Sequence, residues 1–113
     1  MISLNNKKFT VMENSSSGEV GNNTIFEYYE DEQCIYADYY GGDIYKGHLL
    51  GKRLDGNYIE FFYHHLNHNN ELKIGKCKSK IIINSDNNIV LDEIWEWLCD
   101  DFSTGTSLLE EVK

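Results

Sequence analysis

The sequence of 113 residues lacks proline, holds only three cysteines and shows almost no helical periodicity. Because proline removes a backbone hydrogen-bond donor, its absence suits long, uninterrupted strand ladders. Cys34, Cys77 and Cys99 lie far apart and include no Cys-x-x-Cys pair, a pattern that fits neither a disulfide framework nor a zinc site. We therefore expect a protein of the reducing cytoplasm.

Positive charge is also scarce, since 10 Lys and Arg stand against 19 Asp and Glu, a formal net charge of −9. A negative field repels phosphate backbones, so we expect no nucleic-acid partner. No apolar run approaches the roughly 20 residues that span a bilayer, and residues 1–18 lack the apolar core of a secretion signal. We expect no membrane association, and we interpret the glycosylation sequons at Asn14 and Asn22 as chance matches.

Short alternating runs of aromatic and β-branched residues, separated by Gly, Asn and Asp, are abundant. This pattern is typical of strands joined by tight turns. It predicts eight strands, each paired with the next along the chain, and a primed hairpin turn at Asp55-Gly56, because glycine tolerates a positive φ. The predicted ranges are 7–12, 24–30, 34–40, 43–54, 58–66, 71–83, 89–99 and 106–112.

Eight meandering antiparallel strands close most economically into an up-and-down barrel, because closure removes exposed sheet edges. We therefore predict an all-β fold, a single barrel domain over residues 1–113. Ser107 and Glu110 could instead begin a C-terminal helix as a capping box. We favour a strand there, because the first strand otherwise has no partner. Residues 14–23, NSSSGEVGNN, are expected to form a flexible surface loop, with a lid as the alternative.

The charge pattern predicts which side chains point into the barrel. Lys76, Lys78 and Lys80 share one face of a strand, and Asp92 and Glu96 share one face of the next, so these faces complement each other when both are exposed. The opposite faces then point inward and carry aromatic rings, glycines and a few polar groups. The residues that we predict as ligand contacts in this lining are Tyr39, Phe61, Tyr63, His65, Ser79, Glu93, Trp95 and Trp97.

Glu93 is the most informative of these residues. In LDEIWEWLC, residues 91–99, it shares an inward face with Trp95, Trp97 and Cys99, although burying an unpaired carboxylate beside indoles is costly. We favour a non-catalytic barrel in which Glu93 holds the polar end of a small, partly apolar ligand. In the first alternative, Glu93 is the general base of an isomerase- or hydrolase-type enzyme whose acid is Tyr63 or His65.

In a second alternative, the barrel is structural. Its core is then filled, Glu93 is bonded to a neighbouring hydroxyl, and the protein forms a homodimer through outward apolar residues. The residues expected at that contact are Ile82, Ile94 and Leu98.

Two motifs suggest metal or phosphate chemistry, but neither supports it. In HHLNH, residues 64–68, His64 and His65 point to opposite faces of a strand and do not chelate together. GHLLGK, residues 47–52, is one residue too short for a phosphate-binding loop and is followed by arginine. Cys77 points inward and is expected to act as a small buried hydrophobe. We predict no metal and no cofactor.

A resemblance to a known family rests on six segments in order: TIFEYYE, YYGGDIYKGHLLG, FFYHHLN, GKCKS, EIWEW and TGTSLLEE. Together they resemble a family of short bacterial proteins, often labelled N-acetylglutamate synthase and similar to the avidin and calycin class of barrels, which are lipocalin-like. The resemblance covers Phe9 to Val112 and implies that fold. It does not support the synthase label, because an acetyl-CoA-dependent acetyltransferase needs a strand-to-helix turn for the pyrophosphate, and no such turn is predicted.

Overall fold

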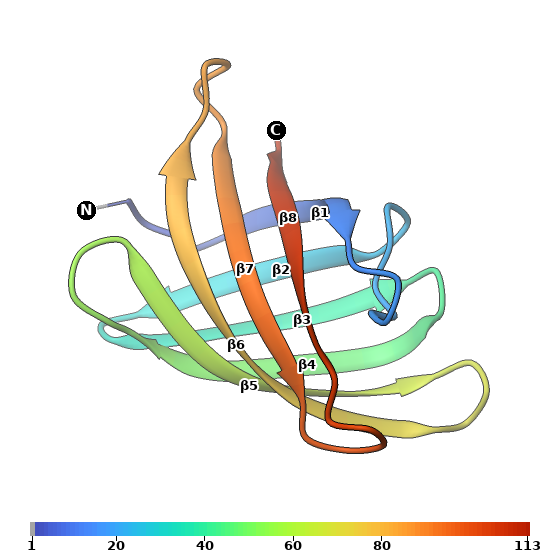
Figure 1. The fold of residues 1–113 in the computed structure, drawn as a ribbon. Helices are drawn as coiled ribbons and strands as arrows, with labels where there is room; N and C mark the ends of the chain where they lie inside the picture. The colour runs from blue at the N-terminus through green and yellow to red at the C-terminus, as the bar shows by residue number, and fades with distance from the viewer. Residues whose placement is uncertain (1) are drawn as a thin grey trace.

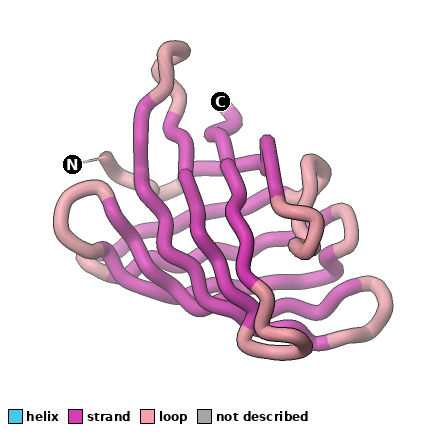
Figure 2. The backbone as a smooth tube through the Cα atoms, in the orientation of Figure 1, coloured by secondary structure: helices cyan, strands magenta, loops and turns pink. Residues whose placement is uncertain are grey.

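The computed structural model describes residues 2–113 and shows a closed barrel of eight antiparallel strands (Figures 1 and 2). Each strand pairs with the next, and the last pairs with the first, which confirms the predicted up-and-down barrel. Within residues 2–113, no helix is long and apolar enough to cross a membrane. The strands are β1 (Lys7–Asn14), β2 (Ile25–Asp31), β3 (Cys34–Gly41), β4 (Ile44–Arg53), β5 (Tyr58–Asn67), β6 (Leu72–Ile83), β7 (Ile89–Trp97) and β8 (Thr104–Val112).

The C-terminal segment is a strand and not a capped helix. Leu109 pairs with Val11 of β1 on one side and with Leu91 of β7 on the other, and it is fully buried. These two ladders close the barrel and leave neither β1 nor β7 as an edge. The choice of a strand over a helix for this segment is thus confirmed.

Two local predictions were wrong. The strand predicted over 89–99 ends at Trp97, because Asp100 and Phe102 adopt left-handed backbone (φ 57° and 56°) and turn the chain back toward β8. Cys99 therefore lies half-buried in a loop and not on the inward face of the strand. At Asp55-Gly56 the connection spans residues 54–57 and Gly56 has the predicted positive φ, 67°, but Asp55 does not, so the turn is not a two-residue primed turn of type I′.

The inward and outward faces follow the predicted alternation. On the outer surface, Lys76 lies opposite Glu96 with 3.5 Å between Nζ and Oε1, and Lys80 lies opposite Asp92. On the inner side, the neighbouring residues of β6 and β7 are buried. The charges of the two exposed faces thus complement each other across the ladder, as the sequence indicated.

One end of the barrel is closed by the segment before β1. Leu4 is fully buried there, and its amide donates to Oε1 of Glu30 at 2.9 Å. The Arg53 guanidinium donates to both oxygens of Glu30, at 2.7 and 2.8 Å, and to the carbonyl oxygen of Ile2 at 2.7 Å. An ion pair with two parallel hydrogen bonds therefore fastens the N-terminal segment across this end.

The opposite end carries the connections 15–24, 42–43, 68–71 and 98–103. The first of these lies between β1 and β2, where the sequence predicted a loop (Figure 1). We refer to residues 15–24 as the β1–β2 loop and to this end of the barrel as the mouth.

Candidate ligand-binding site

A carboxyl group lies inside the barrel between two serines. Ser79, Glu93 and Ser107 face one another directly across β6, β7 and β8. Ser79 donates to Oε2 of Glu93 at 2.8 Å, and Ser107 donates to Oε1 at 2.9 Å. All three side chains are buried. The register of the sheet thus gives each carboxylate oxygen one hydroxyl donor and leaves each oxygen able to accept another hydrogen bond.

Burial raises the pKa of Glu93 to about 7, because the charged form loses its hydration inside the barrel. The two serine hydroxyls and the Cys77 thiol lower the pKa, but they are neutral and do not offset the burial. Glu93 is therefore close to half-protonated near neutral pH.

Aromatic rings form the wall above Glu93. The ring centroids of Trp95 and Trp97 lie 5.8 Å apart at 60°, and those of Tyr63 and Trp97 lie 5.6 Å apart at 65°. Across the barrel, Phe26 and Tyr39 stack at 4.8 Å. The edge-to-face contacts of Trp97 with Trp95 and Tyr63 hold these three rings in fixed orientations and turn their faces in different directions.

Glycines on neighbouring strands make room for these rings. A Cβ atom placed on Gly47 would lie 2.5 Å from the ring of Tyr39. A Cβ atom on Gly75 or on Gly105 would lie at least as close to the ring of Tyr63 or of Trp95. Alternating large and small residues across strands therefore allow several aromatic side chains to fit in one small barrel.

A cavity of about 50 Å³ remains among these side chains. It has room for a few water molecules and is far smaller than the about 300–1,000 Å³ of typical small-molecule pockets. Its lining comprises Asn14, Gly18, Glu19, Val20, Phe26, Tyr39, Leu49, Phe61, Tyr63, His65, Cys77, Glu93, Trp95 and Trp97.

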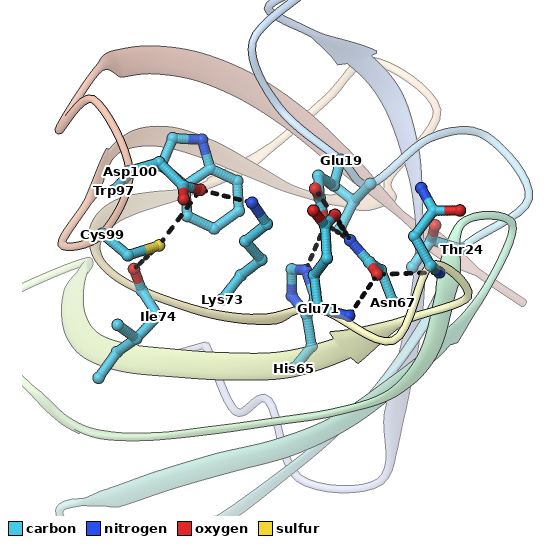
Figure 3. Close-up of polar contacts among 12 residues, drawn as sticks. Glu19, Thr24, His65, Asn67, Glu71, Lys73, Ile74, Trp97, Cys99 and Asp100 are labelled. Carbon is cyan, nitrogen blue, oxygen red and sulfur yellow. Dashed lines mark hydrogen bonds and ion pairs between the residues drawn. The ribbon is translucent and has the colours of Figure 1, made fainter.

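The β1–β2 loop lies over the mouth, where Trp97 bonds the loop itself and Trp95 bonds the last residue of β1. Trp95 donates through Nε1 to Oδ1 of Asn14 at 3.1 Å, and Trp97 donates to the carbonyl oxygen of Ser17 at 3.0 Å. Glu19 of the same loop reaches His65, with 2.8 Å between Oε1 and Nε2, and also accepts from Asn67 at 3.3 Å (Figure 3). The loop therefore forms part of the cavity wall at the mouth, through Gly18, Glu19 and Val20.

His65 lies between this loop and the barrel interior. Its Nδ1 is 2.8 Å from the Tyr39 hydroxyl, while its Nε2 faces Glu19. Burial lowers the pKa of His65 and outweighs the opposing effect of Glu19. In the neutral imidazole, Nε2–H donates to Glu19 and Nδ1 accepts a hydrogen bond from the Tyr39 hydroxyl, so both ring nitrogens are satisfied.

Two buried polar atoms have no partner among the described residues, Nη1 of Arg53 at the closed end and the hydroxyl of Tyr28 in the interior. Among the described residues, the Tyr28 hydroxyl makes no hydrogen bond, although the side chain is fully buried. The ring packs edge-on against Phe9 at 5.2 Å. The pKa of Tyr28 is raised well above its usual value by burial and, secondarily, by the negative charge of Glu93, so its hydroxyl stays protonated.

The structure places all eight predicted contact residues on the inward face of the barrel. All except Ser79 line the cavity, and Ser79 supports Glu93 from beside it. They nevertheless divide into two groups, because Glu93 is bonded to serines deep in the barrel, whereas His65 is bonded to Tyr39 and Glu19 at the mouth.

Sequence reasoning missed three residues of this site. Alternation along the strands could have identified Tyr28 and Ser107, which occupy inward positions. No sequence signal identifies Glu19, because its position depends on how a polar loop folds over the mouth.

Comparison with known families found a match to a model described as Avidin-like protein, over residues 2–112. Comparisons with curated proteins and with solved structures found no match. The N-acetylglutamate synthase label receives no support from these comparisons. Because the match spans all eight strands and agrees with the closed antiparallel barrel, the chain belongs to the avidin-like family.

Proposed function

We propose that the protein binds a small, partly apolar molecule inside the barrel without transforming it. The observation that carries this proposal is an aromatic cavity lined by Glu93, in a barrel interior that also holds an unpartnered tyrosine hydroxyl. Glu93 is buried with neutral donors only, and in the described part of the chain the Tyr28 hydroxyl has no hydrogen-bond partner. Buried polar groups of native proteins are nearly always paired, so a ligand that supplies a further partner accounts for the unused hydrogen-bonding capacity of Glu93. Membership of the avidin-like family is consistent with a ligand-binding barrel.

The size of the cavity requires the β1–β2 loop to act as a lid for any larger ligand. With the loop closed, about 50 Å³ is available. The hydrogen bonds of Ser17 and Glu19 to Trp97 and His65 must break for the mouth to open. Because loops with few buried apolar contacts open at low free-energy cost, this loop is the element that would move.

Tryptophan fluorescence tests this proposal directly, because both tryptophans of the chain line the cavity. We expect at least one member of a broad metabolite panel to shift or quench the emission in a saturable way. Glu93→Gln should change the affinity for that compound, whereas the matched change Glu96→Gln, on the outer face of the same strand, should not. A panel without any saturable response, together with native mass spectrometry that shows no co-purified compound, would contradict the proposal.

Catalysis is the alternative that the inward carboxyl group favours, since a group with a pKa of about 7 suits a general base. The partners proposed for it are less favourable. His65 is engaged at the mouth by Tyr39 and Glu19, and burial raises the pKa of Tyr63. If a turnover is detected, its loss in a folded Glu93→Gln variant would establish this alternative.

Self-association is a second proposal, and an exposed apolar surface favours it. Leu50, Phe62 and Ile94 are 55, 61 and 66% exposed and line one shallow depression on the outside of β4–β7. Positively charged lysines and negatively charged glutamates lie around these three residues. Because both signs are present on one face, the face can pair with the same face of a second copy. Of the residues predicted for such a contact, Ile82 is less exposed and Leu98 is half-buried. Light scattering should show a dimer that Phe62→Lys dissociates, and a wild-type monomer at every concentration would contradict this proposal.

The cytoplasmic location remains a proposal, supported by three free cysteines, of which Cys77 is buried. Burial raises the pKa of the Cys77 thiol, which keeps it protonated and unreactive.

A further inference from the structure

Around the cavity, most hydrogen-bond donors already have a partner, whereas several acceptors have unused capacity. Both indole N–H groups donate to the β1–β2 loop and its flank, and the hydroxyls of Ser79 and Ser107 donate to Glu93. Most donors are therefore occupied, whereas each oxygen of Glu93 can accept another bond. Of the other lining groups, the Cys77 thiol lies 3.7 Å from the Ser79 hydroxyl, and the Tyr63 hydroxyl can accept as well as donate. This surplus of acceptors favours a ligand that donates.

The charges around the cavity also favour a ligand that donates hydrogen bonds and carries a positive charge. Of the described residues that line it, none is lysine or arginine, and its two acidic residues are Glu93 at the bottom and Glu19 at the mouth. The one basic lining residue, His65, has a lowered pKa and is neutral near pH 7. Arg53, by contrast, lies at the closed end and is bonded to Glu30. A positive ligand would give Glu93 the partner that the protein does not supply.

The aromatic wall suits a positive charge as well as apolar substituents. The rings of Trp95 and Trp97 are inclined by 60° and those of Tyr63 and Trp97 by 65°, so the three rings turn their faces in different directions along the cavity wall and do not form a flat stack. A cation over such faces is attracted by the ring quadrupoles, and quaternary ammonium groups are bound in this way by aromatic cages. Carboxylic acids and phosphates would meet Glu93 and the same ring faces with repulsion.

We propose, on the basis of the ligand-binding function above, that the ligand contains a small organic cation. This cation is an ammonium group with methyl or short alkyl substituents, and it lies among the aromatic rings beside Glu93. Its N–H or N–CH₃ groups face the Glu93 carboxylate, and its substituents contact the rings that line the cavity. The cavity of about 50 Å³ limits the buried part to a few heavy atoms.

The test compares choline with 3,3-dimethylbutan-1-ol, a neutral molecule of the same shape, and adds tetramethylammonium and acetate as further probes. Binding is followed through the two indole N–H signals in a ¹H–¹⁵N spectrum, which report on Trp95 and Trp97 alone. We expect saturable shifts with the two cations, at least tenfold weaker binding of the alcohol, and no binding of acetate. Glu93→Gln should weaken cation binding at least tenfold, while the matched variant Glu96→Gln should leave it unchanged.

The wild-type protein provides a second measurement in case Glu93→Gln does not fold. Tetramethylammonium does not titrate, and it favours ionised Glu93, so its affinity should rise about tenfold between pH 6 and pH 8 for a pKa of about 7. The titratable groups that face Glu93 are Tyr28, Tyr63 and Cys77, whose raised pKa values keep them neutral in this range, and Asp92 lies on the outer face beside it.

The outcomes separate this inference from the function on which it rests. Equal or tighter binding of the neutral alcohol, preferential binding of acetate, or a cation affinity independent of pH would overturn the cation assignment and leave a ligand-binding barrel. If no probe moves the indole signals, the cation assignment is overturned. The metabolite panel under Proposed function then decides separately whether the barrel binds any ligand.

Discussion

Two inward-facing carboxyl groups of the same barrel are in contrasting environments. At the closed end, Glu30 accepts two hydrogen bonds from the Arg53 guanidinium and one from the amide of Leu4. In the cavity, Glu93 accepts bonds from two neutral serine hydroxyls. The hydrogen bond from Arg53 lowers the pKa of Glu30, whereas burial raises the pKa of Glu93 to about 7.

This difference separates a structural carboxylate from one that can serve a ligand. The pairing of Glu30 with Arg53 fastens the N-terminal segment and leaves the carboxylate fully engaged. Glu93 destabilises the barrel when it is ionised, and its hydrogen-bonding capacity is only partly used. Perturbed ionisable groups of the second kind cluster at functional sites, which is why Glu93 and not Glu30 marks the candidate site.

The largest effect is expected from breaking the pair at the closed end. Arg53→Met leaves Glu30 without its cation and removes the hydrogen bond to the Ile2 carbonyl oxygen that holds the N-terminal segment. We therefore expect the free energy of unfolding to fall by about 3 kcal/mol or more. Lys52→Met is the matched control, because Lys52 is the adjacent residue and forms an exposed pair with Glu60 at 3.7 Å. It should cost about 0–1 kcal/mol in urea denaturation at pH 7. Similar small losses in both variants would contradict the structural role of Glu30.

The next effect concerns the pH dependence that Glu93 imposes. Because its pKa is about 7 in the folded barrel against 4.5 in a free carboxyl group, the folded state binds more protons between these values. Stability should therefore fall as the pH rises through this window, by about 3 kcal/mol in total. Glu93→Gln removes this dependence, so the variant should gain stability relative to the wild type from pH 5 to pH 8. Urea denaturation at several pH values measures the difference, and a constant difference would contradict the raised pKa.

The surroundings of Glu93 could largely be predicted from the sequence, because they follow from strand geometry. Strict alternation fixed Glu93 on the same face as Trp95 and Trp97, and pairing in chain order placed Ser79 beside it. The prediction that Cys99 lies on the inward face of a strand is wrong, because the strand ends before it. The end of the strand depends on residues with left-handed backbone, and period-two alternation does not identify such residues.

The contacts at both ends of the barrel could not be predicted in the same way. Glu19 reaches His65 across 46 positions in the chain, and Arg53 reaches Ile2 across 51. Both contacts depend on how irregular segments fold over the ends of the barrel. Alternation carries no information about such segments, because they have no repeating geometry.

A smaller effect should follow from removing one hydroxyl donor. Ser107→Ala takes away a hydrogen bond that favours the ionised form, so the pKa of Glu93 should rise further, by about one unit. A ¹³C NMR titration of the Glu93 carboxyl carbon measures this shift. Thr106→Ala, at an exposed position of the same strand, should leave the pKa unchanged. A pKa that stays the same or falls in Ser107→Ala would show that the serine does not hold the charged form.

The smallest effect on stability is expected at the mouth, where Glu19→Gln weakens the bond to His65. Because the Glu19 side chain is 24% exposed, we expect less than about 1 kcal/mol in global stability. Hydrogen exchange should nevertheless accelerate severalfold for amides of the β1–β2 loop and for the Trp97 indole, whose partner is Ser17. The Leu4 amide, bonded to Glu30 at the closed end, should keep its wild-type rate, as should every amide in the exposed control Glu13→Gln. Equal acceleration at both ends would mean that the barrel opens only as a whole, and the β1–β2 loop would then not be an independent lid.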